Sequence, residues 1–178
     1  LRLMAVVTAN FVKRGKIGNA KVKATIRYIQ HRPGKDHERL IRPLFGSDGP
    51  MQRLEAYQLI DEAPKGTVFF RVVINPDPEK EDRLRDLDMR QVAQMTMQSI
   101  EARVRTPVIW AAAVHDDHTD KRHIHALAAV QGRLDKPDLD YLIESTTQAC
   151  LEQRRERDQV LEKQQGEREQ EWEVEWER

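Results

Sequence analysis

One segment constrains the fold of this chain more than any other, the histidine-rich stretch from His115 to His125. Its eleven positions hold four histidines and three aspartates. Short apolar runs flank it at 107–114 and 126–130, and both have the length and the turn-type boundaries of buried strands. The polar segment is then the loop between two strands, and a β-hairpin is the simplest connection.

The spacing of the histidines predicts that their side chains converge. Side chains on a strand alternate between its two faces, so His123 and His125 lie side by side and Ile124 points into the opposite layer. His115, at the end of the preceding strand, supplies a third ring across the hairpin. Three neutral imidazoles that converge on one point suit a divalent cation with open positions for water or substrate.

The other polar residues of the segment leave alternatives open. Asp117 or Asp120 can orient a ligand imidazole through its second ring nitrogen. His118 is an alternative third ligand in place of His115. The alternative interpretation is a polar loop in which the histidines cluster by chance and have no function. The His-x-His spacing on a predicted strand, with a third histidine eight residues upstream, favours a metal site instead.

The histidine pattern resembles that of a known family. His115-x-Asp117-(five residues)-His123-x-His125 resembles the three-histidine motif of relaxases, the mobilisation nucleases of the HUH endonuclease superfamily. The stretch 23–32, Lys-Ala-Thr-Ile-Arg-Tyr-Ile-Gln-His-Arg, is similar to the tyrosine motif of mobilisation-type relaxases. A tyrosine before the histidines is the relaxase order, whereas replication initiators of the superfamily have the reverse order. The resemblance covers roughly residues 1–135.

The resemblance implies a function and roles for the residues that carry it. His115, His123 and His125 would hold Mg²⁺ or Mn²⁺ at a scissile phosphate of single-stranded DNA. Tyr28 would attack that phosphate and leave a 5′-phosphotyrosine and a free 3′-hydroxyl, and the reverse step would rejoin the strand. Asp117 would orient a ligand histidine or help deprotonate the tyrosine. The expected setting is the bacterial cytoplasm, with an origin of transfer as the DNA and accessory transfer proteins as further partners.

Two features depart from the family pattern. Arg122 stands where many relatives have proline, and the tail is acidic without the larger DNA-clamping elements of some relaxases. For Tyr28 the alternative is a half-packed tyrosine at a helix edge, and Tyr57 and Tyr141 are competing nucleophiles. Two other functions also stay open: a relaxase-like DNA-binding or assembly module that does not nick, and a metal-dependent phosphodiesterase that uses water. The run from His115 to His118 is compatible with the second.

The charge distribution favours a nucleic-acid partner. The formal net charge is zero, but residues 1–45 carry eleven Lys/Arg against two acidic residues, whereas 141–178 carry six against eleven. A basic block beside a candidate nucleophile is what binding to a phosphate backbone requires. The residues expected to contact DNA are Lys13, Arg14, Lys16, Lys21, Lys23, Arg27, Arg32 and Arg71.

The remaining patterns predict an α+β domain with a central antiparallel sheet and helices on its faces. The strands are expected at 3–12 (a central strand), 40–45 (a short edge strand), 67–74, 107–115 and 122–130. The helices are expected at 20–31 (capped by Asn19, with Val22, Ile26 and Ile29 in the core), 50–62 and 79–104 (with Leu84, Leu87, Val92, Met95 and Ile100 facing the sheet). A turn is expected at 132–137, and a last helix is expected to begin at 139.

Composition sets the domain boundary and the expected compartment. We assign 1–137 to the relaxase-like domain and 138–178 to a charged, solvated helical tail that can lead into a further C-terminal region. No apolar run approaches the roughly 20 residues of a membrane span, so no membrane insertion is expected. The single cysteine, Cys150, cannot form an intrachain disulfide, which fits a reducing cytoplasm.

Overall fold

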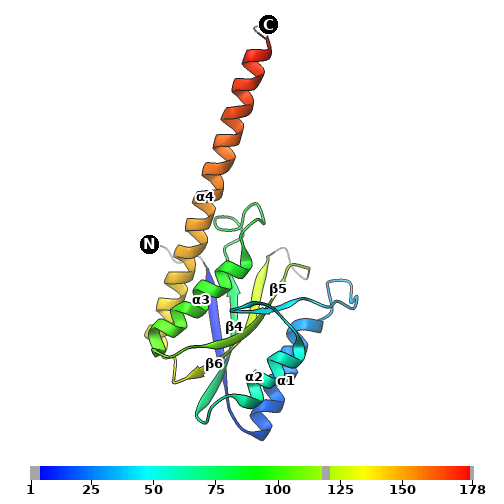
Figure 1. Cartoon of the computed structure of the whole chain (residues 1–178), viewed down its shortest axis with the longest axis vertical. Helices are drawn as coiled ribbons and strands as arrows, with labels where there is room; N and C mark the ends of the chain where they lie inside the picture. Colours follow the sequence, from blue (N-terminus) through cyan, green and yellow to red (C-terminus); the bar gives the residue numbers. More distant parts are fainter. Residues whose placement is uncertain (1–4, 118–120, 177–178) are drawn as a thin grey trace.

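The computed structural model describes residues 5–117 and 121–176, with side chains up to residue 170, and has an α+β fold (Figure 1). The six strands of the described residues form one antiparallel sheet in the order β1-β4-β6-β5-β2-β3, and four helices accompany them. The elements are β1 (Val6–Lys13), α1 (Lys16–His31), β2 (Leu44–Gly46), β3 (Gly49–Met51), α2 (Arg53–Glu62), β4 (Thr67–Asn75), α3 (Met89–Val104), β5 (Ile109–His115), β6 (His123–Gln131) and α4 (Lys136–Trp176).

The β5–β6 hairpin occupies the middle of the sheet, as predicted. β6 pairs with β5 from Ile109 opposite Ala129 to His115 opposite His123. Its other edge pairs with β4 along the same stretch of chain. The central strands are therefore covered by neighbours on both edges, and their two faces are buried by helices. This is why their sequences are near-continuous apolar runs.

Alternating side chains divide the core into two layers. The predicted stripe of α1, with α2 beside it, packs on one face of the sheet, where the buried residues include Val22, Ile26, Ile29, Phe69, Ala111 and Leu127. Helices α3 and α4 cover the other face (Figure 1), where the buried residues include Val72, Val92, Ile100, Trp110, Ile124, Ala126 and Leu142. Ile124 thus points away from the α1 layer, as the strand spacing predicts.

β1 lies at an edge of the sheet, so the prediction of a central strand is wrong. Within the sheet it pairs with β4 alone, and Val6 and Phe11 are exposed. The predicted edge strand at 40–45 is corrected too: only Leu44–Gly46 is extended, it pairs with β5 and β3, and β3 forms the edge. Local β-propensity identifies a strand, but its place in the sheet depends on pairing with distant residues.

Residues 76–88 form a loop, so the predicted helix is wrong over 79–88 and α3 starts only at Met89. Asp77 and Asp82 accept hydrogen bonds from backbone N–H groups within the loop, and Arg85 has a φ of 53°. Leu84 is exposed and does not face the sheet. Asp88 caps α3 by accepting from two N–H groups of its first turn. Short acidic side chains here compete with helical hydrogen bonds for the backbone.

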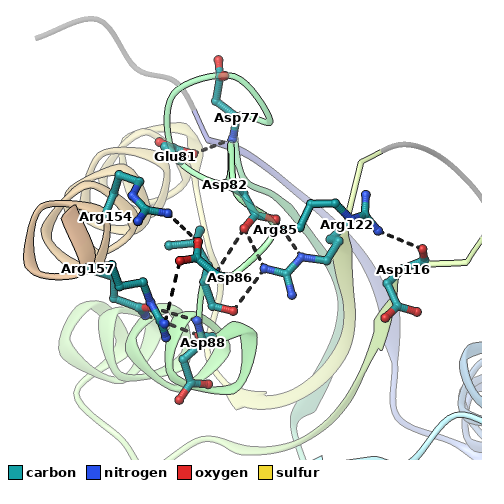
Figure 2. Close-up of polar contacts among 12 residues, drawn as sticks. Asp77, Glu81, Asp82, Arg85, Asp86, Asp88, Asp116, Arg122, Arg154 and Arg157 are labelled. Carbon is teal, nitrogen blue, oxygen red and sulfur yellow. Dashed lines mark hydrogen bonds and ion pairs between the residues drawn. The ribbon is translucent and has the colours of Figure 1, made fainter. Parts of the chain in front are cut away.

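Ion pairs hold this loop to its surroundings (Figure 2). Arg122, directly before β6, donates to both oxygens of Asp82 at 2.8 and 2.6 Å. Arg154 of α4 pairs with Asp86 of the loop, and also with Asp158 at 2.8 Å. The loop therefore connects α4 with the segment that leads into the central strand.

Two helix starts differ from prediction. α1 begins at Lys16, after Gly15, whose φ of 153° favours glycine. Asn19 lies inside the helix, and its Oδ1 accepts from the N–H of Gly15, so it is not the cap. α4 begins at Lys136 and not at 139, because Asp135 and Asp138 accept each other's backbone N–H groups at its start.

The first part of α4 belongs to the core, and the rest leaves it. Leu142 and Cys150 are buried in the α3/α4 layer, whereas every residue from Gln159 to Gln170 except Gly166 is exposed. Figure 1 shows this second part extending away from the sheet. Among the described helices, none has a segment long and apolar enough to cross a membrane.

Candidate metal centre and adjoining groove

The three predicted ligand histidines come together on the α1 side of the sheet. His115 ends β5, His123 begins β6 directly opposite, and His125 lies two residues further along the same face. One ligand atom from each ring lies within 4.8 Å of the others, and the ring centroids are 4.5 to 5.3 Å apart. This cluster can hold a metal ion.

Hydrogen bonds occupy some ring nitrogens of the cluster and leave others without a partner. His115 Nε2 lies 2.7 Å from the carbonyl oxygen of Ile29. Because a carbonyl only accepts, Nε2 carries the proton, and the unprotonated Nδ1 keeps a lone pair that can bind a metal. His115 Nδ1 and His125 Nε2 are buried without a hydrogen-bond partner among the described residues. His123 Nδ1 donates to the carbonyl of Lys121 at 3.2 Å. Buried nitrogens that lack partners are what a metal-binding donor set provides.

Burial keeps these rings neutral. It lowers the pKa of His115 to about 3, with the neighbouring His125 as the next cause. It likewise lowers the pKa of His125 to about 4, followed by the effects of His123 and Arg32. At neutral pH both rings are therefore uncharged, and their lone pairs are available to a cation without the loss of a proton.

Asp117 has a partner that the sequence does not predict. Its two carboxylate oxygens each accept from Arg42 Nη2 at 2.7 Å. Burial alone would raise the pKa of Asp117, but the hydrogen bonds and charge of Arg42 outweigh it and hold that pKa below its ordinary value. The ring of His115 is oriented by the Ile29 carbonyl and not by Asp117. The alternative residues His118 and Asp120 lie outside the described residues.

Tyr28 is the tyrosine that lies beside the cluster. Its ring, half exposed, meets the ring of His125 edge-on at a centroid distance of 6.5 Å, and the Arg32 guanidinium lies 5.8 Å from its centroid. Tyr57 is instead partly buried under Lys23. Tyr141 lies on α4, the helix on the opposite side of the sheet from the histidines. The geometry thus brings the predicted nucleophile, and neither competitor, to the candidate metal centre.

A groove runs from this point between α1 and the strands β1 and β4. Its volume is about 500 Å³, and its lining includes Tyr28 and His125 at one end with Lys21, Thr25, Asn10 and Arg71 beyond them. Arg71 and Asn10 face each other across the β1–β4 pair. β1, an edge strand, forms one wall of the groove through Asn10.

The predicted DNA-contacting residues divide into two sets. Lys21 and Arg71 line the groove, Arg32 lies against Tyr28, and Arg27 is exposed on α1. The others lie elsewhere: Lys23 pairs with Asp61 at 2.5 Å and Arg14 donates to the Asp61 carbonyl, while Lys13 ends β1 and Lys16 begins α1. Lys13 is opposite Val68, five residues along β4 from the partner of His125, a distance of about 17 Å.

Sequence reasoning missed Arg42 and the two neutral groove residues Asn10 and Thr25. Arg42 stands between Ile41 and Pro43, and an isolated arginine among apolar residues is a weak sign of burial. Its partner is 75 positions away, so no local pattern identifies the pair.

Comparison with known proteins adds no relative. No family model matches the chain, and neither a curated protein nor a solved structure is similar to it at a significant level.

Proposed function

We propose that the protein is a metal-dependent transesterase that nicks and rejoins single-stranded DNA through Tyr28. The observation that carries the proposal is the half-exposed Tyr28 ring against His125, at the end of an open groove that contains Lys21 and Arg71. A buried three-histidine cluster, a phenol and a basic groove in one place are the parts that such a reaction needs. The resemblance to mobilisation relaxases supports the same combination.

His115, His123 and His125 would hold the cation, which withdraws charge from the phosphoryl oxygens when it is bound. A donor set made only of nitrogen favours Mn²⁺ over Mg²⁺, since Mg²⁺ prefers oxygen ligands. Lys21 and Arg71 would bind the phosphates that lie along the groove, and Arg32 would place a positive charge beside the phenol.

The reaction conserves the number of phosphate ester bonds. The Tyr28 oxygen forms a bond to phosphorus as the bond from phosphorus to the 3′ oxygen breaks. The proton lost by the phenol is balanced by the proton that the new 3′-hydroxyl gains. No nucleotide cofactor or oxidant is consumed, so the reverse attack by a 3′-hydroxyl rejoins a strand. In a bacterial setting this chemistry would start the transfer of a plasmid or mobile element from its origin, together with accessory transfer proteins.

The test uses single-stranded oligonucleotides of randomised sequence, labelled at one end, with the full chain and Mn²⁺. A 5′-phosphotyrosine keeps the 3′ portion of the strand, so 3′-labelled DNA should give a labelled protein in denaturing gels and 5′-labelled DNA should not. Tyr28→Phe should abolish the adduct, and the matched control Tyr141→Phe should retain it. Removing a half-exposed hydroxyl should change stability by about 1 kcal/mol or less.

Each other result identifies an alternative. An adduct in the Tyr28→Phe protein would place the nucleophile elsewhere, and peptide mapping would locate it. Cleavage without an adduct would indicate a water-using phosphodiesterase. Binding without cleavage, for a pool that contains every short sequence, would indicate a DNA-binding or assembly module.

A further inference from the structure

Arg42 is buried and makes contacts that binding of a ligand does not explain. Its side chain is 5% exposed. Nη1 donates to the carbonyl oxygen of Arg32 at 2.7 Å, and Nη2 donates to both oxygens of Asp117. Its backbone N–H donates to the carbonyl of Gln30 at 2.9 Å. One residue therefore joins the end of α1 to the segment that follows β5.

These contacts satisfy carbonyl groups that a helix leaves without partners at its C-terminus. The Gln30 carbonyl accepts from the Arg42 backbone, and the Arg32 carbonyl accepts from the Arg42 guanidinium. The Ile29 carbonyl accepts from His115, a candidate metal ligand. The contacts that terminate α1 and the contact that orients a ligand ring thus belong to the same turn.

We infer that Arg42 and Asp117 form a brace that positions both parts of the candidate site, the ligand His115 and the nucleophile Tyr28; the second part rests on the proposed function. By fixing the last turn of α1, the brace fixes the Ile29 carbonyl that selects the Nε2–H form of His115. Tyr28 precedes Ile29 in the same turn, so its ring is placed against His125 by the same contacts.

The chemistry of the pair suits a brace better than a phosphate ligand. A guanidinium that is 5% exposed and already donates to a carboxylate has little surface left for a DNA phosphate. Its planar fork reaches two acceptors at once, which a lysine cannot do. Breaking a buried pair leaves a charge without compensation, so loss of either partner should disturb the turn that they hold.

The experiment compares Arg42→Gln, Asp117→Asn and the double variant in the full chain. Arg154→Gln is the matched control, because Arg154 is also 5% exposed, also pairs with aspartates and lies on the opposite side of the sheet. Three properties are measured: Mn²⁺ affinity by calorimetry, the ¹⁵N shifts of the His115 ring, and the salt dependence of binding to single-stranded DNA. The rate of adduct formation at saturating DNA is a fourth.

Each single brace variant should bind Mn²⁺ about tenfold more weakly, the lower end of what partners of ligand histidines contribute. The Mn²⁺ affinity of the double variant should fall no further than that of either single variant, because the two residues act as one unit. The ¹⁵N shifts should show a loss of the Nε2–H preference, the salt slope should stay unchanged, and the adduct rate should fall at least tenfold. Arg154→Gln should keep wild-type Mn²⁺ affinity even where its melting temperature falls.

Wild-type Mn²⁺ affinity and ring shifts in Arg42→Gln and Asp117→Asn would overturn the inference. An equal loss in Arg154→Gln would overturn it too, since the effect would then be general destabilisation, and a reduced salt slope would make Arg42 a phosphate ligand. Should Arg42→Gln fail to fold, Asp117→Asn decides, because it keeps the shape and one acceptor. Should the wild type form no adduct, the proposed function fails, while Mn²⁺ affinity and ring shifts still test the brace.

Discussion

The loop at 76–88 and the groove beside α1 differ in whether their charged groups are paired. On the α3/α4 side, the loop at 76–88 pairs its carboxylates with Arg122 and Arg154 (Figure 2). On the α1 side, Lys21 and Arg71 have no ion pair among the described residues and line a groove that ends at ring nitrogens without partners. Charges that stabilise a fold are paired with one another, whereas charges that remain available mark a surface for a ligand.

The largest expected effect is on metal binding by the histidine cluster. Replacing His123 and His125 together by alanine should abolish Mn²⁺ binding, because two of three ligands are lost, while β6 stays paired with both neighbours. Calorimetry measures the binding, and circular dichroism checks the fold. Wild-type affinity in this double variant would mean that the cluster is not the metal site.

The next effect is on the stability that the ion pairs of the loop at 76–88 provide. Asp82→Asn should lower the free energy of unfolding by about 3 kcal/mol, because Arg122 is left largely buried without its partner charge. Asp138→Asn, whose partner Arg103 is 41% exposed, should cost less than about 1 kcal/mol. Urea unfolding measures both. Mn²⁺ affinity should stay within about threefold of wild type, and its loss in Asp82→Asn would show that the two sides are not independent.

An effect of similar size that depends on pH comes from Glu81, a fully buried residue of the loop. Burial raises its pKa to about 7 and outweighs the hydrogen bond from the Asp77 N–H, which lowers it. A raised pKa means that the folded state holds the proton more tightly than the unfolded state, so this contribution to stability is complete below about pH 4.5 and is lost as the pH rises through 7. Glu81→Gln should remove that decline. The free energy of unfolding of Glu81→Gln relative to wild type should rise by up to about 3 kcal/mol between pH 5 and 8. If the two proteins differ by the same amount at every pH, the pKa of Glu81 is not raised.

The smallest effect separates the two sets of basic residues. Replacing Lys21 and Arg71 by glutamine should reduce the slope of log affinity for single-stranded DNA against log salt by about 1.4, or about 0.7 for each lost phosphate contact. The same change at Lys13, which ends β1, and Lys16, which begins α1, should reduce it less, because neither residue lines the groove. Fluorescence anisotropy at several salt concentrations measures both slopes, and the reverse order would move the DNA surface to the start of α1.

The histidine cluster could be predicted because its geometry is local. Residues two apart on a strand lie on the same face. The spacing alone therefore predicts that His123 and His125 share a face and that Ile124 lies on the other. The apolar stripe of α1 follows from helical spacing in the same way. Both patterns are complete within a dozen residues.

The missed features depend on distant or competing contacts. The edge position of β1 and the pairing of Arg42 with Asp117 are decided by residues far away in the sequence. The sequence predicts a helix over 79–88 because Leu84 and Leu87 continue the apolar spacing of α3. Backbone hydrogen bonds to Asp77 and Asp82 outweigh that pattern, and only Leu87 is buried.

The position of β6 between two paired neighbours also has a consequence for dynamics. A strand hydrogen-bonded along both edges opens only with the whole domain, so the backbone around His125, which is paired with both β4 and β5, should exchange with solvent most slowly. α1 has solvent on its outer side and a groove along one flank, and it can move in smaller openings. His125 would then keep its place on β6 through openings that expose the outer turns of α1, whereas the last turn of α1 is held by Arg42.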